Sequence, residues 1–210
     1  MIILTGASSG IGKAIKKELK NEKVITICRN CEIKVDFNNI EEVKKIKLKN
    51  IKGIINCAGV GYFGQFEDIK SEKIIEMINI NLTAPILLTK NHLKDIKKNR
   101  GFIINIASTS ALTPARLGVV YSSTKAGLIQ FSKSLFEEVR KNKVKVCTIL
   151  PDLTLTNFHN NTFFKPSNDE LAHIKPEDIA KIIKEIIYSP PNIVIQEIVI
   201  KPQIFKIEKN

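Results

Sequence analysis

The residue types with the clearest chemistry are a tyrosine and a lysine four positions apart, in Tyr121-Ser-Ser-Thr-Lys125. If this stretch is helical, its spacing puts the phenol and the ammonium on one face. An unperturbed tyrosine has a pKa near 10, so proton transfer near neutral pH requires a downward shift of roughly 3 units, or about 4 kcal/mol. An ammonium about 4 Å away supplies roughly that amount at an effective dielectric constant near 20. The pair therefore suggests a general acid and base, although this spacing alone is also typical of an ordinary amphipathic helix.

A serine precedes this pair at a place where it can join the same site. Ser108 follows the apolar run Ile104-Asn-Ile-Ala, which we predict to be the end of a central strand. Ligands of open α/β sheets bind at the carboxyl ends of such strands. A hydroxyl there can donate a hydrogen bond to a carbonyl oxygen as negative charge develops on it. Together the three residues favour interconversion of a carbonyl and an alcohol.

A glycine-rich turn lies near the start of the sequence, in Thr5-Gly-Ala-Ser-Ser-Gly-Ile-Gly12. It lies between an expected strand and an expected helix, where backbone N–H groups and a helix N-terminus can bind a pyrophosphate. Glycine allows the close approach and the unusual dihedral angles of such a turn. The spacing differs from the commoner G-x-G-x-x-G, and an ordinary tight turn is the alternative. Its position directly after the first strand favours a dinucleotide-binding turn.

The end of the second predicted strand bears on which dinucleotide is bound. That strand closes with Cys28-Arg29-Asn30 and lacks the acid that would accept hydrogen bonds from a free ribose 2′-hydroxyl. Arg29 can instead pair with a 2′-phosphate, which favours NADP(H) over NAD(H), although a solvated surface arginine is the alternative. Asp36 is the rival acid, but it closes the short third strand, and we expect it beside the adenine ring.

Short β-branched runs alternate with stretches of helical spacing along the whole chain, the pattern of parallel strands joined by crossover helices. We predict strands at residues 1–4, 24–28, 33–36, 53–56, 101–106, 144–150 and 193–200, and helices at 11–20, 40–46, 71–98, 121–141 and 176–188, with a break at Pro85. The expected fold is a single α/β domain over residues 1–210, a doubly wound parallel sheet of about seven strands with helices on both faces. Residues 151–175 are the least regular, and with Phe158, His159, Phe163 and Phe164 they are expected to form a lid over a pocket.

Composition narrows the class of protein further. The chain of 210 residues has a net charge of +12, but its lysines are spread over most predicted helices, so we expect a solvated surface and consider nucleic-acid binding unlikely. No apolar run approaches the roughly 18 residues of a membrane span, and no leader precedes the first strand, so we expect a soluble, cytoplasmic protein. Of the four cysteines, Cys28 and Cys31 have redox or metal spacing, but no second pair completes a zinc site. Reduced thiols and no metal are the expectation.

Taken together, these motifs resemble the classical short-chain dehydrogenase/reductase family, with a Rossmann-type fold. The resemblance runs from residue 3 to about residue 156 and includes the glycine turn, Asn56-Cys-Ala-Gly59 and the segment from Tyr121 to Lys125. It implies that Tyr121 exchanges the proton, that Ser108 positions the substrate oxygen, and that Lys125 lowers the tyrosine pKa and binds the nicotinamide ribose. It also implies that Asn81 holds a water linking Lys125 to solvent. The cofactor residues that the resemblance and the turn imply are Gly6, Ser8, Ser9, Gly10, Ile11, Gly12, Arg29, Asp36, Asn56, Ala58, Gly59, Ile106, Tyr121, Lys125, Pro151 and Thr156.

One position departs from the family pattern. Asp152 follows Pro151 where the family usually has glycine, so either the loop path shifts or the carboxylate contacts substrate. The family also implies a homodimer or homotetramer, formed through helices equivalent to residues 82–98 and 121–141. Residues 109–118, 151–175, Tyr62 and Phe63 are expected to select a small to medium substrate.

We therefore expect an NADP(H)-dependent carbonyl reductase or alcohol dehydrogenase. The alternative is a catalytically silent regulatory protein that binds a nicotinamide dinucleotide. The intact tyrosine, lysine, serine and asparagine argue against that alternative, because a pure binder needs no proton relay.

Overall fold

The computed structural model describes residues 1–158 and 162–209, so His159 of the predicted lid lies outside the described residues. Seven strands form one parallel sheet in the order β3-β2-β1-β4-β5-β6-β8. They are β1 (Ile2–Thr5), β2 (Val24–Cys28), β3 (Ile33–Lys34), β4 (Gly53–Asn56), β5 (Phe102–Ile106), β6 (Lys145–Pro151) and β8 (Glu197–Ile200). The order reverses between β1 and β4, which is where open α/β sheets leave a crevice for ligands.

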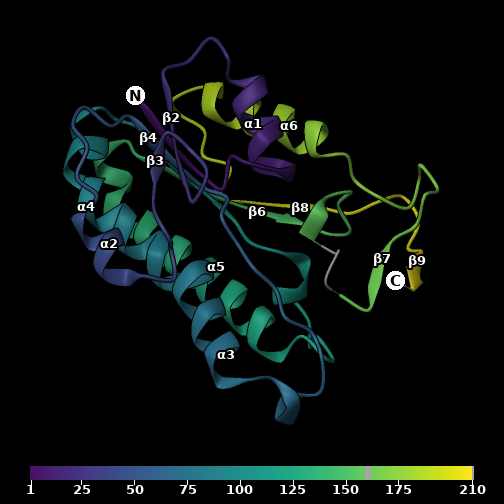
Figure 1. Ribbon diagram of the computed structural model, residues 1–210. Helices are drawn as coiled ribbons and strands as arrows, with labels where there is room; N and C mark the ends of the chain where they lie inside the picture. The colour runs from purple at the N-terminus through teal and green to yellow at the C-terminus, as the bar shows by residue number, and fades with distance from the viewer. Residues whose placement is uncertain (159–161, 210) are drawn as a thin grey trace.

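The helices cover both faces of this sheet (Figure 1). They are α1 (Gly10–Glu18), α2 (Ile40–Lys45), α3 (Ser71–Ile78), α4 (Ala84–Lys98), α5 (Val119–Val139) and α6 (Pro176–Tyr188). Helices α1 and α6 lie together on one face, and α2, α4 and α5 lie on the other. The predicted Rossmann-type α/β domain is therefore confirmed.

Alternating side chains of the strands explain the two layers of the core. Ile3 and Ile103 pack into the cluster under α4 and α5, while their neighbours Leu4 and Ile104 pack into the cluster under α1 and α6. Successive residues of a strand point to opposite faces, so a continuous apolar run suits a strand buried on both sides. All four side chains are 0 or 1% exposed, as the centre of such a sheet requires.

Three predicted elements differ in the structure. The single helix predicted over residues 71–98 is divided by a π-helical turn, Asn79–Thr83, and Pro85 lies in the first turn of α4, where its missing N–H costs no hydrogen bond. Strand β3 ends at Lys34, so Asp36 lies beyond the strand rather than closing it. The predicted lid contains a strand, β7 (Phe164–Pro166), which pairs antiparallel with β9 (Ile207–Lys209) at the end of the chain.

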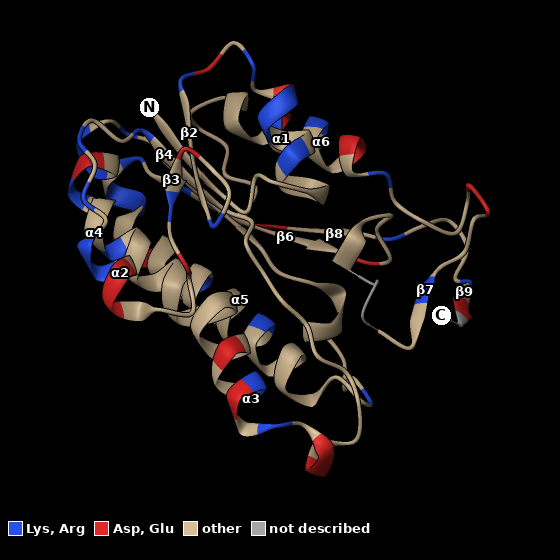
Figure 2. Cartoon of the chain, viewed as in Figure 1, with Lys and Arg blue, Asp and Glu red and all other residues tan. Residues whose placement is uncertain are grey.

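The distribution of charge and the lengths of the helices concern two further expectations, a solvated charged surface and the lack of a membrane span. Lysine and arginine are spread over several helices rather than gathered on one element, and aspartate and glutamate lie among them on most of these helices (Figure 2). No helix among the described residues is long and apolar enough to cross a membrane.

Candidate active site

The three residues predicted to do chemistry lie on the wall of one cavity of about 830 Å³ at the carboxyl ends of the strands. Tyr121 and Lys125 lie one turn apart at the start of α5, and Ser108 follows β5. Strand β5 and helix α5 therefore position the whole group, because the end of the strand lies against the first turns of the helix. The Lys125 ammonium donates to the Ile106 carbonyl oxygen at 2.8 Å, which ties helix and strand together at this point.

The hydroxyl of Ser108 is held by a residue that sequence reasoning missed. Ser110 lies in a 3-10 turn after β5, and its Oγ donates to Ser108 Oγ at 3.0 Å. The Ser110 backbone N–H also points to that oxygen, at 3.3 Å. These contacts occupy the lone pairs of Ser108 Oγ and leave its proton to be donated. The signal in the sequence was the Ser-Thr-Ser run, but only the turn brings its two hydroxyls together.

The tyrosine pKa differs in direction from the sequence expectation. Burial of the phenol raises the pKa of Tyr121 to about 12, and a side-chain hydrogen bond with Ser108 acts weakly in the opposite direction. The Lys125 Nζ lies 5.8 Å from the centre of the Tyr121 ring. The direction of the Tyr121 pKa is therefore set by burial, because a desolvated phenolate is disfavoured.

Lys125 is itself perturbed by its surroundings. Burial lowers its pKa to about 8, since a desolvated ammonium is disfavoured. Its side chain is 4% exposed and lies near Asn81, because a Cβ atom added at Gly59 would sit 3.3 Å from Lys125 Nζ and 3.4 Å from Asn81 Oδ1. The absence of a side chain at Gly59 thus lets both polar groups approach the backbone closely.

Asn81 lies in the π-helical turn and does not line the cavity. Its Oδ1 accepts from the Val60 N–H at 2.9 Å, and its Nδ2 donates to the Val60 carbonyl at 2.8 Å and to Thr124 Oγ1 at 3.1 Å. π-Helical turns often mark functional positions. Here the turn directs a buried amide that fixes the loop after β4 against α5.

The residue before that loop is also buried. Asn56 is 2% exposed and is absent from the cavity wall, unlike the other predicted cofactor residues. Its Nδ2 donates to Asn105 Oδ1 at 2.7 Å, and Asn105 in turn donates to Ser132 Oγ at 2.8 Å. Asn56 therefore links β4 to β5 and α5, with its amide in the core rather than on the cavity wall.

The remaining residues predicted to bind a cofactor all border the cavity: Gly6, Ser8, Ser9, Gly10, Ile11, Gly12, Arg29, Asp36, Ala58, Gly59, Ile106, Tyr121, Lys125, Pro151 and Thr156. Gly6 and Gly10 have φ angles of 70° and 49°, in the left-handed region that favours glycine. A Cβ atom at Gly12 would lie 2.2 Å from the Gly6 carbonyl oxygen. The turn is therefore packed so tightly that only glycine fits, and α1 begins there with its N-terminal N–H groups uncapped by a side chain.

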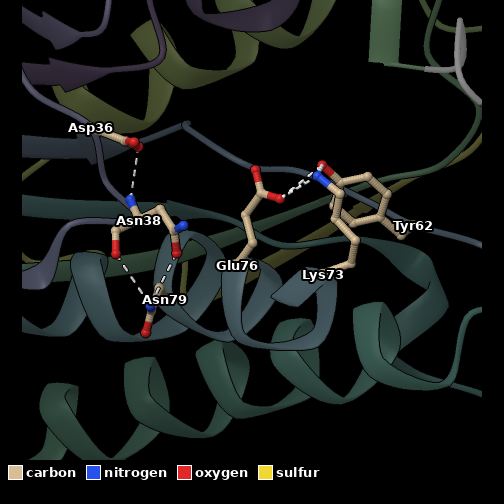
Figure 3. Close-up of polar contacts among 6 residues, drawn as sticks. All are labelled: Asp36, Asn38, Tyr62, Lys73, Glu76 and Asn79. Carbon is tan, nitrogen blue, oxygen red and sulfur yellow. Dashed lines mark hydrogen bonds and ion pairs between the residues drawn. The ribbon is translucent and has the colours of Figure 1, made fainter. Parts of the chain in front are cut away.

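The far end of the cavity contains the two candidates for contact with the adenosine. Arg29 is exposed and makes no hydrogen bond or ion pair with any residue that the structure describes. Asp36 is held in place, since its Oδ1 accepts from the Asn38 N–H at 3.0 Å and Asn38 is bonded to Asn79, as Figure 3 shows. An unpaired cation and a fixed carboxylate thus both border this part of the wall.

The two cysteines flanking Arg29 correct another expectation. Cys28 and Cys31 form a disulfide rather than two reduced thiols. The chain turns back after β2, with the Cys31 N–H donating to the Cys28 carbonyl at 3.4 Å, and this turn brings the two Cα atoms to 5.0 Å. That separation lies within the usual range for a disulfide. Cys57 and Cys147 are free thiols.

Tyr62 and Phe63 were both predicted to select substrate, but the structure places only one of these two residues on the cavity wall. Phe63 lines the cavity. Tyr62 does not, because its hydroxyl bonds to Glu76 at 3.0 Å and to Lys73 at 2.9 Å on α3, as Figure 3 shows. This contact holds Tyr62 on the outer side of the loop, and the hydrogen bond and charge of Glu76 raise the pKa of Lys73.

Fold and site together define a Rossmann-fold protein with a dinucleotide-sized cavity, and the tyrosine, lysine and serine lie on its wall. The sequence model described as short chain dehydrogenase matches residues 16–166. The chain belongs to the short-chain dehydrogenase family and is an oxidoreductase with an NAD(P)-binding type of fold.

Several proteins are similar over almost the whole chain. An uncharacterized oxidoreductase of Staphylococcus aureus strain USA300 is 29% identical, with 95% of this chain and 96% of the relative covered. An alcohol dehydrogenase from the archaeon Thermococcus sibiricus, complexed with 5-hydroxy-NADP, has a TM-score of 0.82 at 21% identity and covers 96% of this chain and 95% of its own. A 4-hydroxyisoleucine dehydrogenase complexed with NADH and succinate has a TM-score of 0.79 at 25% identity, with coverages of 96% and 98%. The solved relatives thus carry both kinds of nicotinamide dinucleotide.

Proposed function

We propose that this protein interconverts a carbonyl and an alcohol with NADP(H), with Tyr121 as the general acid and base. The observation that carries the proposal is the convergence of Tyr121, Ser108 and Lys125 on the cavity that also contains the glycine turn. A dinucleotide fits this wall, because the close packing at Gly6 and Gly12 brings backbone N–H groups and the start of α1 to the cavity. The bound cofactor would supply or accept the hydride.

In the reductive direction, Tyr121 would donate its proton to the substrate oxygen. Ser108 would donate a hydrogen bond to the same oxygen, since Ser110 occupies the acceptor sites of its hydroxyl. Developing negative charge on that oxygen would be stabilised by both donors at once.

Lys125 would hold the nicotinamide ribose through its ammonium and replenish the proton of Tyr121. The closeness of its ammonium to Asn81 and Gly59 supports a relay through a water molecule held by Asn81. Because burial lowers the pKa of Lys125 to about 8, this amine can gain or lose a proton near neutral pH, as a relay requires.

The preference for NADP(H) rests on the adenosine end of the cavity. Arg29 is an unpaired cation among the described residues, and a 2′-phosphate would give it a charge-assisted partner. As parts of the same proposal, we place the protein in the cytoplasm as a homodimer or homotetramer and assign residues 151–175 as a lid, on the family resemblance and the irregular sequence.

One observation favours the second candidate, a regulatory protein that binds the dinucleotide without chemistry. Burial raises the pKa of Tyr121 to about 12, which makes the phenol a poor acid and base at neutral pH unless a bound ligand changes its surroundings. The two functions differ in whether the tyrosine proton is ever transferred.

The test is the Tyr121→Phe variant, which removes only the hydroxyl. We expect turnover of a carbonyl panel with NADPH to fall by at least about a hundredfold, in the range of general acid catalysis, while NADPH binding is retained. The matched control is Tyr188→Phe, since Tyr188 is 56% exposed at the end of α6 and outside the cavity. Full activity of Tyr121→Phe would exclude the mechanism, and tight NADPH binding by a wild type that turns over no substrate would establish the regulatory protein.

A further inference from the structure

Aromatic rings surround the reacting tyrosine on the side of the cavity away from the glycine turn. The Tyr121 ring centre lies 5.3 Å from that of Phe63 and 5.6 Å from that of Phe158. Phe164 lies 5.6 Å from Phe63, and Phe163 lies 5.1 Å from Phe164. All five rings line the cavity, so a group bound next to the tyrosine hydroxyl meets aromatic surface.

The end of the chain supplies a further part of this wall, which the sequence did not suggest. Strand β9 pairs with β7 and brings Phe205 and Ile207 to the cavity (Figure 1). Their side chains are 74% and 46% exposed although both are large and apolar. Apolar surface in water is unfavourable by roughly 25 cal/mol per Å², so a bound apolar group that covers these side chains gains free energy.

Charges of both signs lie on this part of the wall. Besides Lys125, the described charged residues here are Asp152 and Lys201. Each directly follows one member of the register pair Pro151 and Ile200, so the carboxylate and the ammonium leave neighbouring strand ends. The Asp152 N–H also donates to the Ile200 carbonyl at 2.9 Å. A substrate carboxylate or phosphate would therefore meet the Asp152 carboxylate as well as the Lys201 ammonium, so its net electrostatic gain here is small and does not offset the cost of its desolvation.

We propose that the substrate is an uncharged carbonyl compound, or the matching alcohol, that carries an aryl group next to the reacting carbon. Phe164 and Phe205 determine this specificity, since Phe164 lies in β7, Phe205 lies two residues before β9, and both border the cavity. The inference rests on the proposed function for the site and adds the class of substrate. Aromatic pairs are worth about 0.5–1.5 kcal/mol beyond burial alone, which is roughly a threefold to tenfold gain for each ring contact.

Three probe substrates separate the effect of the aryl ring from the effect of a negative charge. Ethyl benzoylformate is a neutral aryl ketone, benzoylformate is the same ketone with a carboxylate, and ethyl pyruvate is the neutral ketone without the ring. For the wild-type protein with NADPH we expect kcat/KM to be highest for ethyl benzoylformate, by about tenfold or more over each of the others. Equal or better use of benzoylformate or ethyl pyruvate would overturn the proposal.

Alanine variants then test whether these two phenylalanines determine the specificity for the aryl ring. Phe164→Ala and Phe205→Ala should each lower kcat/KM for ethyl benzoylformate by about tenfold and change it little for ethyl pyruvate. Phe66→Ala is the matched control, because Phe66 is 55% exposed and absent from the cavity wall. An unchanged NADPH dissociation constant in all three variants shows that the fold and the cofactor end are intact. Equal losses for both esters would contradict a specific role of these rings.

A binding measurement distinguishes failure of the proposed substrate class from failure of the proposed function. If the wild type reduces none of the probes, the proposed function fails for them, and saturation-transfer NMR of ethyl benzoylformate and benzoylformate with the protein–NADPH complex still tests the wall. Tighter binding of the ester, weakened by Phe164→Ala and Phe205→Ala, supports the substrate class. Tighter binding of the acid, or binding that both variants leave unchanged, refutes it.

Discussion

Replacing Arg29 with alanine should weaken the binding of NADPH while leaving the binding of NADH nearly unchanged. Arg29 is exposed on the cavity wall, and no described residue neutralises it. The nearest acid along the chain, Glu32, is already bonded to Thr26 at 2.9 Å and to Lys16 at 3.3 Å. The only negative charge that the proposal brings to Arg29 is the 2′-phosphate, which NADH lacks.

The size of the effect follows from the exposure of Arg29. Hydrogen bonds to charged groups contribute about 1.5–3 kcal/mol, and solvent around an exposed side chain favours the lower part of that range. A loss of about 1.5–2 kcal/mol corresponds to a rise of about tenfold to thirtyfold in the NADPH dissociation constant. The contribution should shrink as salt is added, because the Debye length falls from about 10 Å at 0.1 M to about 3 Å at 1 M.

The assay is a titration of wild type and Arg29→Ala with NADPH and with NADH, followed by nicotinamide fluorescence at low and high ionic strength. Lys17→Ala is the control, since Lys17 is an exposed cation of α1 that does not border the cavity. It removes the same formal charge from the surface and should change neither dissociation constant.

Two results would refute the reasoning. Equal weakening of NADPH and NADH by Arg29→Ala would mean that the arginine supports the fold of the loop rather than reading the phosphate. Unchanged NADPH binding would mean that the cation is merely solvated and that the preference for NADP(H) has no basis in this residue.

Three other predictions concern the turn, the buried amine and the disulfide. Gly12→Ala should lower Tm and NADPH affinity, because its Cβ would lie 2.2 Å from a backbone oxygen, whereas Gly64→Ala, with no atom within 4 Å of the added Cβ, should change neither. Burial lowers the pKa of Lys125 to about 8 in the folded protein, so the unfolded state binds more protons between about pH 8 and 10, and this residue's contribution to the free energy of unfolding rises with pH over that window. Lys125→Met should therefore gain stability over wild type at pH 7 and lose that advantage by pH 10 in urea titrations; a constant difference would contradict the assigned pKa. Reducing the Cys28–Cys31 disulfide with dithiothreitol should loosen the loop that carries Arg29 and raise the NADPH dissociation constant several-fold. Dithiothreitol should have no such effect on the Cys28→Ser, Cys31→Ser double variant.

Local sequence determined most of the fold and the identity of the reacting groups. The strands β2 and β4 and the helix α6 begin and end at the predicted residues, since apolar period and helix-start residues are local signals. The spacing of Tyr121 and Lys125 needs only helical geometry to place both on one face. Glycine is required at residue 12 by the tightness of a turn that is itself only a few residues long.

Tertiary structure decided what depends on contacts between distant segments. Asn56 points into the core because Asn105, on the neighbouring strand, offers an acceptor at 2.7 Å. The pKa of Tyr121 is raised rather than lowered because burial, which the sequence does not give, outweighs the hydrogen bond with Ser108.

The apolar wall beside Tyr121 also depends on contacts between distant segments. Strands β7 and β9 lie some 40 positions apart, as in the register pair Pro166 and Ile207, and neither is long enough to give a periodic signal. Their pairing alone brings Phe205 to the cavity. The sequence thus determined the candidate catalytic groups and the glycine turn, whose geometry is local, whereas burial sets the direction of the Tyr121 and Lys125 pKa shifts and long-range pairing builds the wall on which the proposed substrate class depends.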